Sequence, residues 1–223
     1  MLHPKKITAF IVALVAFVTA HAQPTQFSLA TDVSVLRSFK ETQQYWAIGQ
    51  TVKFHFNFMP KDGAYAWLAY FADGKFVNGL TAIAKSPTTT PQQIDYFNGS
   101  ALRFEHISLG WQHYLHGKFN SEYWNLYAYG GFGLMIGRVV NTPTTPIDTS
   151  MYHVEVLSGK GHFKRLTFDL GLGAELSLSA AVYMYLEARA MVPTTYYPSP
   201  YLLVNYKAPF TGAGSFGFRI LFD

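Results

Sequence analysis

The chain has 223 residues, of which 49% are apolar and 17% aromatic, while only 13% are charged and none is cysteine. Average soluble domains carry about 25% charged residues, so this composition predicts a surface that water does not fully solvate. The lack of cysteine excludes disulfides, thiolate-bound metals and a cysteine nucleophile. The length suits one domain.

Residues 1–22 have the form of a secretory signal peptide. Lys5 and Lys6 precede the apolar run Ile7–Ala20, and Ala20-His21-Ala22 has the small-x-small form that signal peptidase cleaves. The run has 14 residues, fewer than the ~20 that a membrane-spanning helix needs. We therefore expect residues 23–223 to form the mature domain. Cleavage removes two lysines and no acid, which lowers the formal net charge from +4 to +2, so no nucleic-acid partner is expected.

The mature chain contains eight segments in which apolar and polar residues alternate, as they do in β-strands. The connections between them are alternately short and long, and the long ones are rich in Pro, Thr, Asn and Ser. Short periplasmic turns and long extracellular loops are typical of outer-membrane barrels. The eight segments are residues 25–38, 45–58, 64–73, 101–115, 123–140, 161–176, 181–192 and 210–222. The long connection over residues 73–100 has room for an additional hairpin, for example at residues 75–84.

The composition of the two strand faces decides between a soluble barrel and a membrane barrel. In residues 161–176, Leu, Phe and Ala fill one face, while Thr167, Asp169 and Glu175 lie with glycines on the other. A membrane barrel has its apolar face outward, and a small one fills its interior with side chains. We therefore assign the apolar face to lipid and the mixed face to the lumen. Residues 64–73 are ambiguous, because Ala66, Leu68 and Ala72 fall on the supposed inner face.

The last segment resembles the end of the small outer-membrane barrel family of the OmpA, OmpX and OmpW type. Phe216, Phe218, Ile220 and Phe222 alternate to the end of the chain, although Phe222 is followed by Asp223. The resemblance implies an all-β fold, a single eight-stranded antiparallel transmembrane β-barrel, in the outer membrane of a Gram-negative bacterium. It also implies the barrel-assembly machinery as a partner, and no cofactor is expected.

Aromatic residues near the short-turn end of several strands are expected to form an outward girdle where lipid meets water. The residues assigned to this girdle are Phe56, Phe58, Tyr65, Trp67, Trp111, Trp124 and Phe222.

Four outward cations, Arg37, Arg103, Arg138 and Lys164, fall at the opposite end, with Glu105 close by. We hypothesise that they bind lipopolysaccharide phosphate, since Arg binds phosphate in bidentate fashion. The alternative is that these charges are simply solvated.

The inward face carries a set of charges that must be paired, because a buried charge is costly alone. If residues 177–180 form a turn, Asp169 lies opposite Arg189, with Glu187 diagonal, and Asp32 faces the region of Lys53. We favour a structural salt-bridge network that closes the lumen, and the alternative is a narrow ion path or a proton-linked site. The predicted network comprises Asp32, Lys53, Asp169, Glu175, Glu187, Arg189 and Arg219.

One short motif has a catalytic form. His106 and Ser108 share a strand face, and the pattern faintly resembles the His-x-Ser motif of outer-membrane lipid A deacylases. That family continues with Asn, where this chain has Leu109. Both residues also face inward here, so we expect no catalytic site, and the scattered histidines predict no metal site.

The sequence therefore predicts a non-enzymatic outer-membrane barrel with a structural or surface-interaction role, since loops on a rigid scaffold usually carry binding. Two alternatives remain: a narrow channel for small or apolar solutes, and a lipid A-modifying hydrolase. The first requires a lumen that is open and apolar in its extracellular half.

Overall fold

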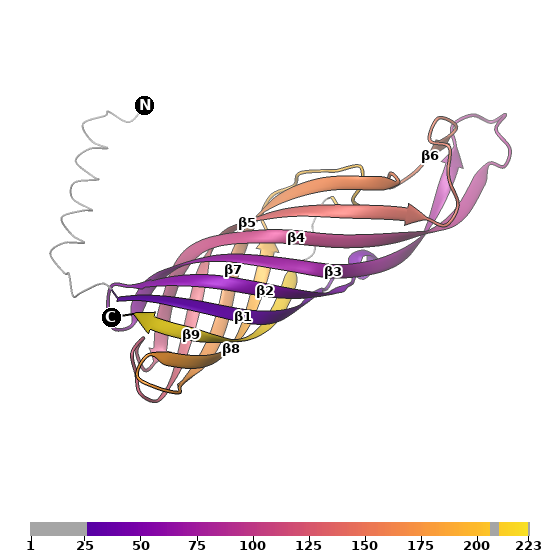
Figure 1. Cartoon of the computed structure of the whole chain (residues 1–223). Helices are drawn as coiled ribbons and strands as arrows, with labels where there is room; N and C mark the ends of the chain where they lie inside the picture. The colour runs from indigo at the N-terminus through magenta and orange to yellow at the C-terminus, as the bar shows by residue number, and fades with distance from the viewer. Residues whose placement is uncertain (1–25, 206–209, 223) are drawn as a thin grey trace, which may run out of the picture.

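The computed structural model describes residues 26–205 and 210–222, and these form a closed antiparallel β-barrel (Figure 1). The expected signal peptide lies outside the described residues. Eight long strands form the ring, and β1 closes it by pairing with both β2 and β9. The strands are β1 (Gln26–Ser38), β2 (Trp46–Asn57), β3 (Asp62–Ala84), β4 (Gln93–His116), β5 (Trp124–Pro143), β7 (Gly159–Ser177), β8 (Val182–Pro193) and β9 (Thr211–Phe222). The predicted eight-stranded fold is confirmed.

Two short elements accompany the ring. A 3-10 turn, η1 (Glu41–Gln43), joins β1 to β2, and β6 (Tyr152–His153) pairs with the far end of β3. Within the described residues, no helix has both the length and the apolar character needed to cross a membrane.

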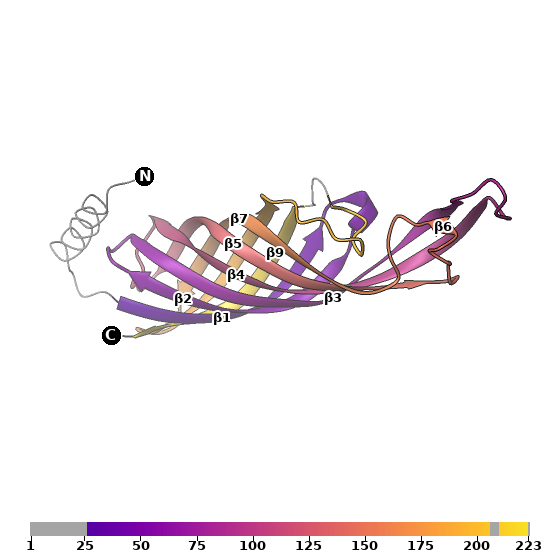
Figure 2. The same ribbon diagram turned by 90° about the horizontal axis from the view of Figure 1, so that it is seen from above.

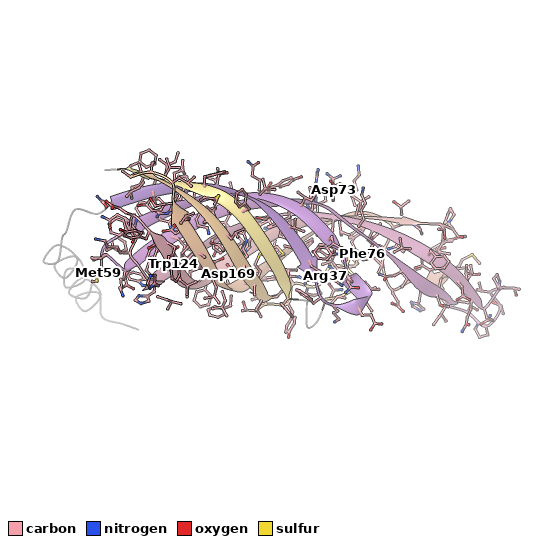
Figure 3. The ribbon with its side chains drawn as sticks, turned by 90° about the horizontal axis from the view of Figure 1, so that it is seen from below. Arg37, Met59, Asp73, Phe76, Trp124 and Asp169 are labelled. Carbon is pink, nitrogen blue, oxygen red and sulfur yellow. The ribbon has the colours of Figure 1, made fainter. Side chains whose placement is uncertain are left out.

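The two ends of the barrel differ. The connections 58–61, 117–123 and 178–181 lie at one end, here called the turn end, where β1 begins and β9 ends. The connections 39–45, 85–92, 144–158 and 194–210 start from the other end, here called the loop end. Figure 3 shows Met59 and Trp124 toward the turn end and Arg37 and Asp73 toward the loop end.

The strands β3, β4 and β5 continue past the loop end as a projecting sheet (Figure 2). Most of the long connection expected over residues 73–100 is therefore hairpin, paired from Gly74 with Leu102 to Ile83 with Gln93. Residues of the 144–158 connection cover the lumen-side face of this sheet. The apolar cluster that they form with it contains Leu80, Ala82, Tyr96, Tyr152 and Val156.

Burial alternates along the strands as expected for a thin wall with two different faces. In β2, Ile48 is 62% exposed whereas Lys53 is 2% exposed. Most outer side chains of the ring are apolar, and the inner ones are mainly polar, aromatic or glycine. The predicted face assignment is confirmed for β2, β5, β7 and β8.

The face assignment of β3 was wrong. Tyr65 and Trp67, assigned to the outward girdle, lie in the lumen at 2% exposure, and Leu68 faces outward. The Trp67 indole finds a hydrogen-bond partner inside, which a buried Trp generally requires. The other five girdle residues do lie outward at the turn end, where Phe27 stacks on Phe222.

A β-bulge after Phe71 then reverses the inner and outer positions of β3. The pairing with β4 shifts by one residue between Phe71 and Gly74, and Asp73 adopts a positive φ of 60°. An extra residue in one strand exchanges its two faces. Phe71 is therefore inward before the bulge, and Leu80 and Ala82 are inward after it.

Candidate functional site

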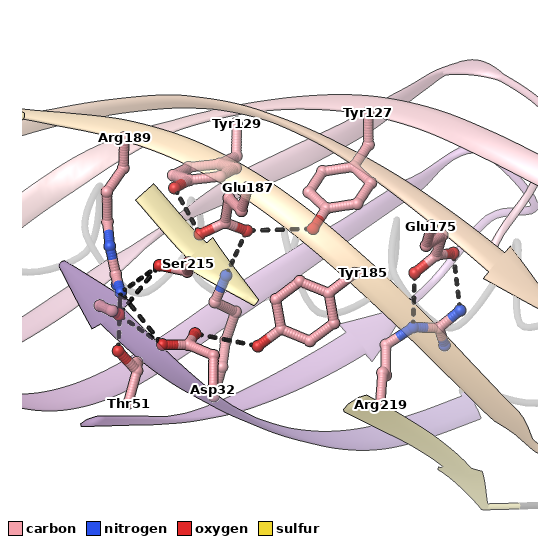
Figure 4. Close-up of polar contacts among 12 residues, drawn as sticks. Asp32, Thr51, Tyr127, Tyr129, Glu175, Tyr185, Glu187, Arg189, Ser215 and Arg219 are labelled. Carbon is pink, nitrogen blue, oxygen red and sulfur yellow. Dashed lines mark hydrogen bonds and ion pairs between the residues drawn. The ribbon is translucent and has the colours of Figure 1, made fainter. Parts of the chain in front are cut away.

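The lumen is crossed by a layer built on a short buried ion pair. Lys53 Nζ lies 2.6 Å from Glu187 Oε2, and both side chains are shielded from solvent. The Tyr127 and Tyr129 hydroxyls donate to the two Glu187 oxygens at 3.0 and 2.7 Å (Figure 4). Four side chains from β2, β5 and β8 thus pair their polar atoms with one another, as buried charges require.

A second layer lies nearer the loop end, two residues further along β8. Arg189 Nη2 lies 3.3 Å from Asp32 Oδ1 and donates to Thr51 Oγ1 at 2.7 Å and Ser215 Oγ at 2.9 Å. The Tyr185 hydroxyl donates to Asp32 Oδ2 at 2.9 Å (Figure 4). This layer joins β1, β2, β8 and β9 across the barrel.

A third layer lies toward the turn end. Arg219 Nε and Nη2 bond both oxygens of Glu175 at 2.9 and 2.7 Å in a bidentate pair. Asn125 donates to the same carboxylate at 2.9 Å, and the Arg219 guanidinium lies 4.0 Å from the centre of the Tyr183 ring. Six of the seven predicted network residues are therefore brought together as three ion pairs.

The partners within these layers differ from those predicted. Asp169 lies opposite Met191, and Arg189 lies opposite Gly171, so the expected Asp169–Arg189 pair does not form. The expected turn over residues 177–180 is centred one residue too early, because Ser177 pairs with Tyr183. Moving a turn centre by one residue moves the register by two. Asp32 does lie near Lys53 along the sheet, opposite Thr51, but across the lumen Asp32 bonds Arg189 and Lys53 bonds Glu187.

Asp169, the seventh network residue, lies beside His106 rather than beside a cation. Trp67 Nε1 donates to His106 Nδ1 at 3.1 Å, and because an indole N–H only donates, Nδ1 carries no proton. The imidazole is therefore the neutral Nε2–H form. Its Nε2 lies 2.9 Å from Thr167 Oγ1 and 3.4 Å from Asp169 Oδ2.

The His106 and Ser108 side chains both face the lumen, as expected, but they do not form a base–nucleophile pair. Ser108 Oγ donates to the Phe132 carbonyl oxygen at 3.2 Å. Both residues are essentially inaccessible to solvent. A substrate has no approach to Ser108 in this arrangement.

The lumen changes character at the loop end, where it is lined by apolar residues. These include Leu36, Phe71, Leu102, Phe104, Val139, Phe163 and Met191. The loop residue Leu202 packs into the same cluster. The loop-end half of the lumen is thus apolar but filled. Arg165 is buried close to this cluster, and the sequence reasoning missed it because its role depends on a loop contact.

The outer surface carries three of the four predicted rim cations close together. Arg103 lies directly opposite Arg138, which in turn lies opposite His162. Lys164 lies two residues beyond His162 on β7, opposite Ile136. These four side chains, Arg103, Arg138, His162 and Lys164, are here called the rim cluster. Arg37 lies elsewhere, on β1, with its guanidinium 4.8 Å from the centre of the Trp46 ring.

A closed eight-stranded barrel with an apolar outer face and a charged, packed lumen defines the class of small outer-membrane-type β-barrels. Solved structures of that class have the same fold. Ail of Yersinia pestis, solved in complex with the heparin analogue sucrose octasulfate, is 10% identical over 90% of this chain and 100% of its own (TM-score 0.50). Neisserial surface protein A is 11% identical over 88% and 97% (TM-score 0.52).

A major outer membrane protein of Thermus thermophilus is 9% identical over 90% of this chain and 100% of its own (TM-score 0.53). These likenesses confirm the predicted fold. No family model matches the sequence, and no curated protein matches it.

Proposed function

We propose that this protein is a non-enzymatic, integral outer-membrane barrel with a structural and surface-interaction role. The observation that carries this proposal is the distribution of polarity: the outer face exposes Leu109, Phe132 and Leu186, while the ion pairs lie inside. Such an apolar belt is costly in water, whereas in a bilayer it contacts acyl chains. A ring without a free edge also suits lipid, which offers backbone groups no hydrogen bonds.

We also infer that the rim cluster binds phosphate groups of lipopolysaccharide. Like charges directly opposite each other on a sheet are destabilising, so the Arg103–Arg138 pair needs an anion between its guanidinium groups. Arg138 Nε is buried without a hydrogen-bond partner. A phosphate group has the geometry to accept bidentate bonds from both arginines.

The test of the rim cluster compares two double variants that remove equal charge. Arg103→Gln with Arg138→Gln removes the opposed pair, and Lys61→Gln with Lys118→Gln removes two cations at the turn end. We expect the first variant to retain severalfold less lipopolysaccharide during purification from outer membranes, measured as lipid A by mass spectrometry. We expect the second to match the unmodified protein. Equal retention by both variants contradicts the proposal.

The turn end then faces the periplasm, and the projecting sheet faces the cell exterior. The alternating aromatic end of β9 supports recognition by the barrel-assembly machinery during biogenesis, as the family resemblance implies. The projecting sheet supports a surface-interaction role, because its cluster around Leu80 and Tyr96 gives it a core of its own. The alternative of a lipid A-modifying hydrolase finds no support in the environment of Ser108.

A further inference from the structure

Residues 199–205 form a compact turn that closes the loop end of the lumen, and this segment is here called the plug. Asn205 holds it together: its Nδ2 donates to the Ser199 and Leu202 carbonyl oxygens at 3.1 and 2.9 Å, and its Oδ1 accepts from Ser199 N at 2.7 Å. Leu202 and Val204 are both buried. The plug thus places the Leu202 side chain in the apolar chamber, and it buries Val204, whose carbonyl oxygen meets Arg165.

Hydrogen bonds to three residues outside the plug hold its backbone in place. Asn141 Nδ2 donates to the Tyr201 carbonyl oxygen at 2.8 Å, and Leu157 N donates to the Pro200 carbonyl oxygen at 2.8 Å. Arg165 Nη2 donates to the Val204 carbonyl oxygen at 2.7 Å. No described residue of the plug adds a strand to the barrel ladder. The plug therefore can leave without breaking the ring.

Arg165 is only 4% exposed, yet it forms no ion pair within the part of the chain that the structure describes. Its neighbours include the Phe163 ring, 5.6 Å from the guanidinium, Met135, opposite it on β5, and the buried Tyr45. A buried cation without a counter-charge is unfavourable, and a single carbonyl oxygen neutralises none of its charge.

We propose that this chamber binds a medium-chain carboxylate, whose head group replaces the Val204 carbonyl on Arg165 and whose tail replaces Leu202 and Val204. A carboxylate accepts two parallel bonds from a guanidinium, which supplies the missing counter-charge. The apolar walls favour an alkyl tail over a small hydrophilic anion. Two aliphatic side chains leave room for a short tail, and octanoate represents this class.

A neutral apolar solute fits the chamber less well. When the plug leaves, such a solute offers no hydrogen-bond acceptor to replace the Val204 carbonyl oxygen, so the buried Arg165 guanidinium loses its partner. The proposal concerns the lumen and is independent of lipid binding at the rim cluster. Below the chamber, the Arg189–Asp32 and Lys53–Glu187 layers close the barrel, so the site is for binding rather than for passage.

The test uses an octanoate analogue with a diazirine in its tail, cross-linked by light to the protein in phosphatidylcholine nanodiscs. We expect mass spectrometry to locate the cross-links on inward residues of the chamber, such as Leu36 and Met191. Free octanoate should compete, whereas octanol should compete about tenfold less well, the size expected for losing a bond to a charged group. Cross-links confined to outward residues, or equal competition by octanol, overturn the proposal.

Variants of Arg165 separate recognition from folding. Arg165→Met should reduce labelling at least tenfold, and Arg165→Lys should retain most of it, because the charge remains. Both variants should keep the heat-dependent gel mobility of a folded barrel. Lys85→Met removes an exposed charge elsewhere at the loop end and should label normally. Undiminished labelling of a folded Arg165→Met variant overturns the proposal.

A steric variant tests whether the plug must move. A Cβ placed on Gly161 would collide with the Tyr201 side chain of the plug. Gly161→Val should therefore displace the plug and raise labelling by the probe, while Gly214→Val, where a Cβ meets no atom within 4 Å, should label like the unmodified protein. Equal labelling of the two variants overturns the plug's part in the proposal.

Discussion

Six charged residues of the lumen are matched one to one in three layers, and the stability of the barrel depends on each partner being present. Glu187 accepts hydrogen bonds from three side chains, those of Lys53, Tyr127 and Tyr129. Breaking a buried pair leaves an uncompensated charge, which is far more destabilising than removing both members.

Glu187→Gln should therefore lower the free energy of unfolding by about 3–5 kcal/mol, because Lys53 remains buried and charged. Adding Lys53→Met to Glu187→Gln should recover most of the loss, since the glutamine carbonyl oxygen still accepts from one tyrosine and its amide can donate to the hydroxyl of the other. Urea titrations in phospholipid vesicles, followed by tryptophan fluorescence, measure both effects. The exposed pair of Lys75 and Asp73 is the control: Asp73→Asn should cost less than about 1 kcal/mol. A Glu187→Gln loss no larger than this contradicts the ion-pair description.

At the scale of elements, large inward side chains of β5 lie opposite inward glycines of β7. Tyr127 lies opposite Gly173 and Tyr129 opposite Gly171, and a Cβ on either glycine would collide with the opposing ring. The tyrosines can reach Glu187 because their rings cross the space that these glycines leave open. Glycine is thus required here for close approach rather than for an unusual backbone angle.

Gly173→Val should reduce the yield of folded barrel and destabilise what folds by at least about 1–3 kcal/mol, the usual cost of overpacking. Gly214→Val is the matched control, because Gly214 faces outward on β9 and a Cβ there meets no atom within 4 Å. The folded fraction is measured by the heat-dependent gel mobility after refolding into vesicles. Equal yields for the two variants contradict the packing argument.

For the whole molecule, the three ion-pair layers and the plug close the lumen independently. Eight strands enclose a space just wide enough for side chains, and here tyrosines and ion pairs fill the central part. The barrel is therefore expected to be a scaffold that displays the projecting sheet rather than a pore.

In planar bilayers, the intact protein should give no large, stable current steps. Replacing residues 199–205 with a Gly-Ser linker should also leave it closed, because the Arg189–Asp32 and Lys53–Glu187 layers lie beneath. Glu187→Ala combined with Arg189→Ala removes charge from both layers and should produce small conductances if it folds. Stable currents from the intact protein contradict a sealed lumen.

The alternation of apolar and polar residues was enough to predict the class of fold, the strand number and the strand bounds within a few residues in most of the ring. It succeeded because each face of a membrane barrel meets a single environment, lipid or packed interior. It failed on the first part of β3 because aromatic residues such as Trp67 suit either environment, and it could not foresee that the bulge at Asp73 exchanges the two faces further along the strand.

Pattern alone also identified the inward charges but not their partners. Which carboxylate meets which cation depends on register around the ring, and a turn centred at residue 180 rather than one residue earlier changes every pairing between β7 and β8 by two residues. Arg165 and the plug could not be predicted, because the loop has no periodicity and its contact with the wall exists only in three dimensions. The sequence by itself thus determined which side of most strands is buried, a local property, and only the tertiary structure decided which charges meet, since that depends on closing the ring.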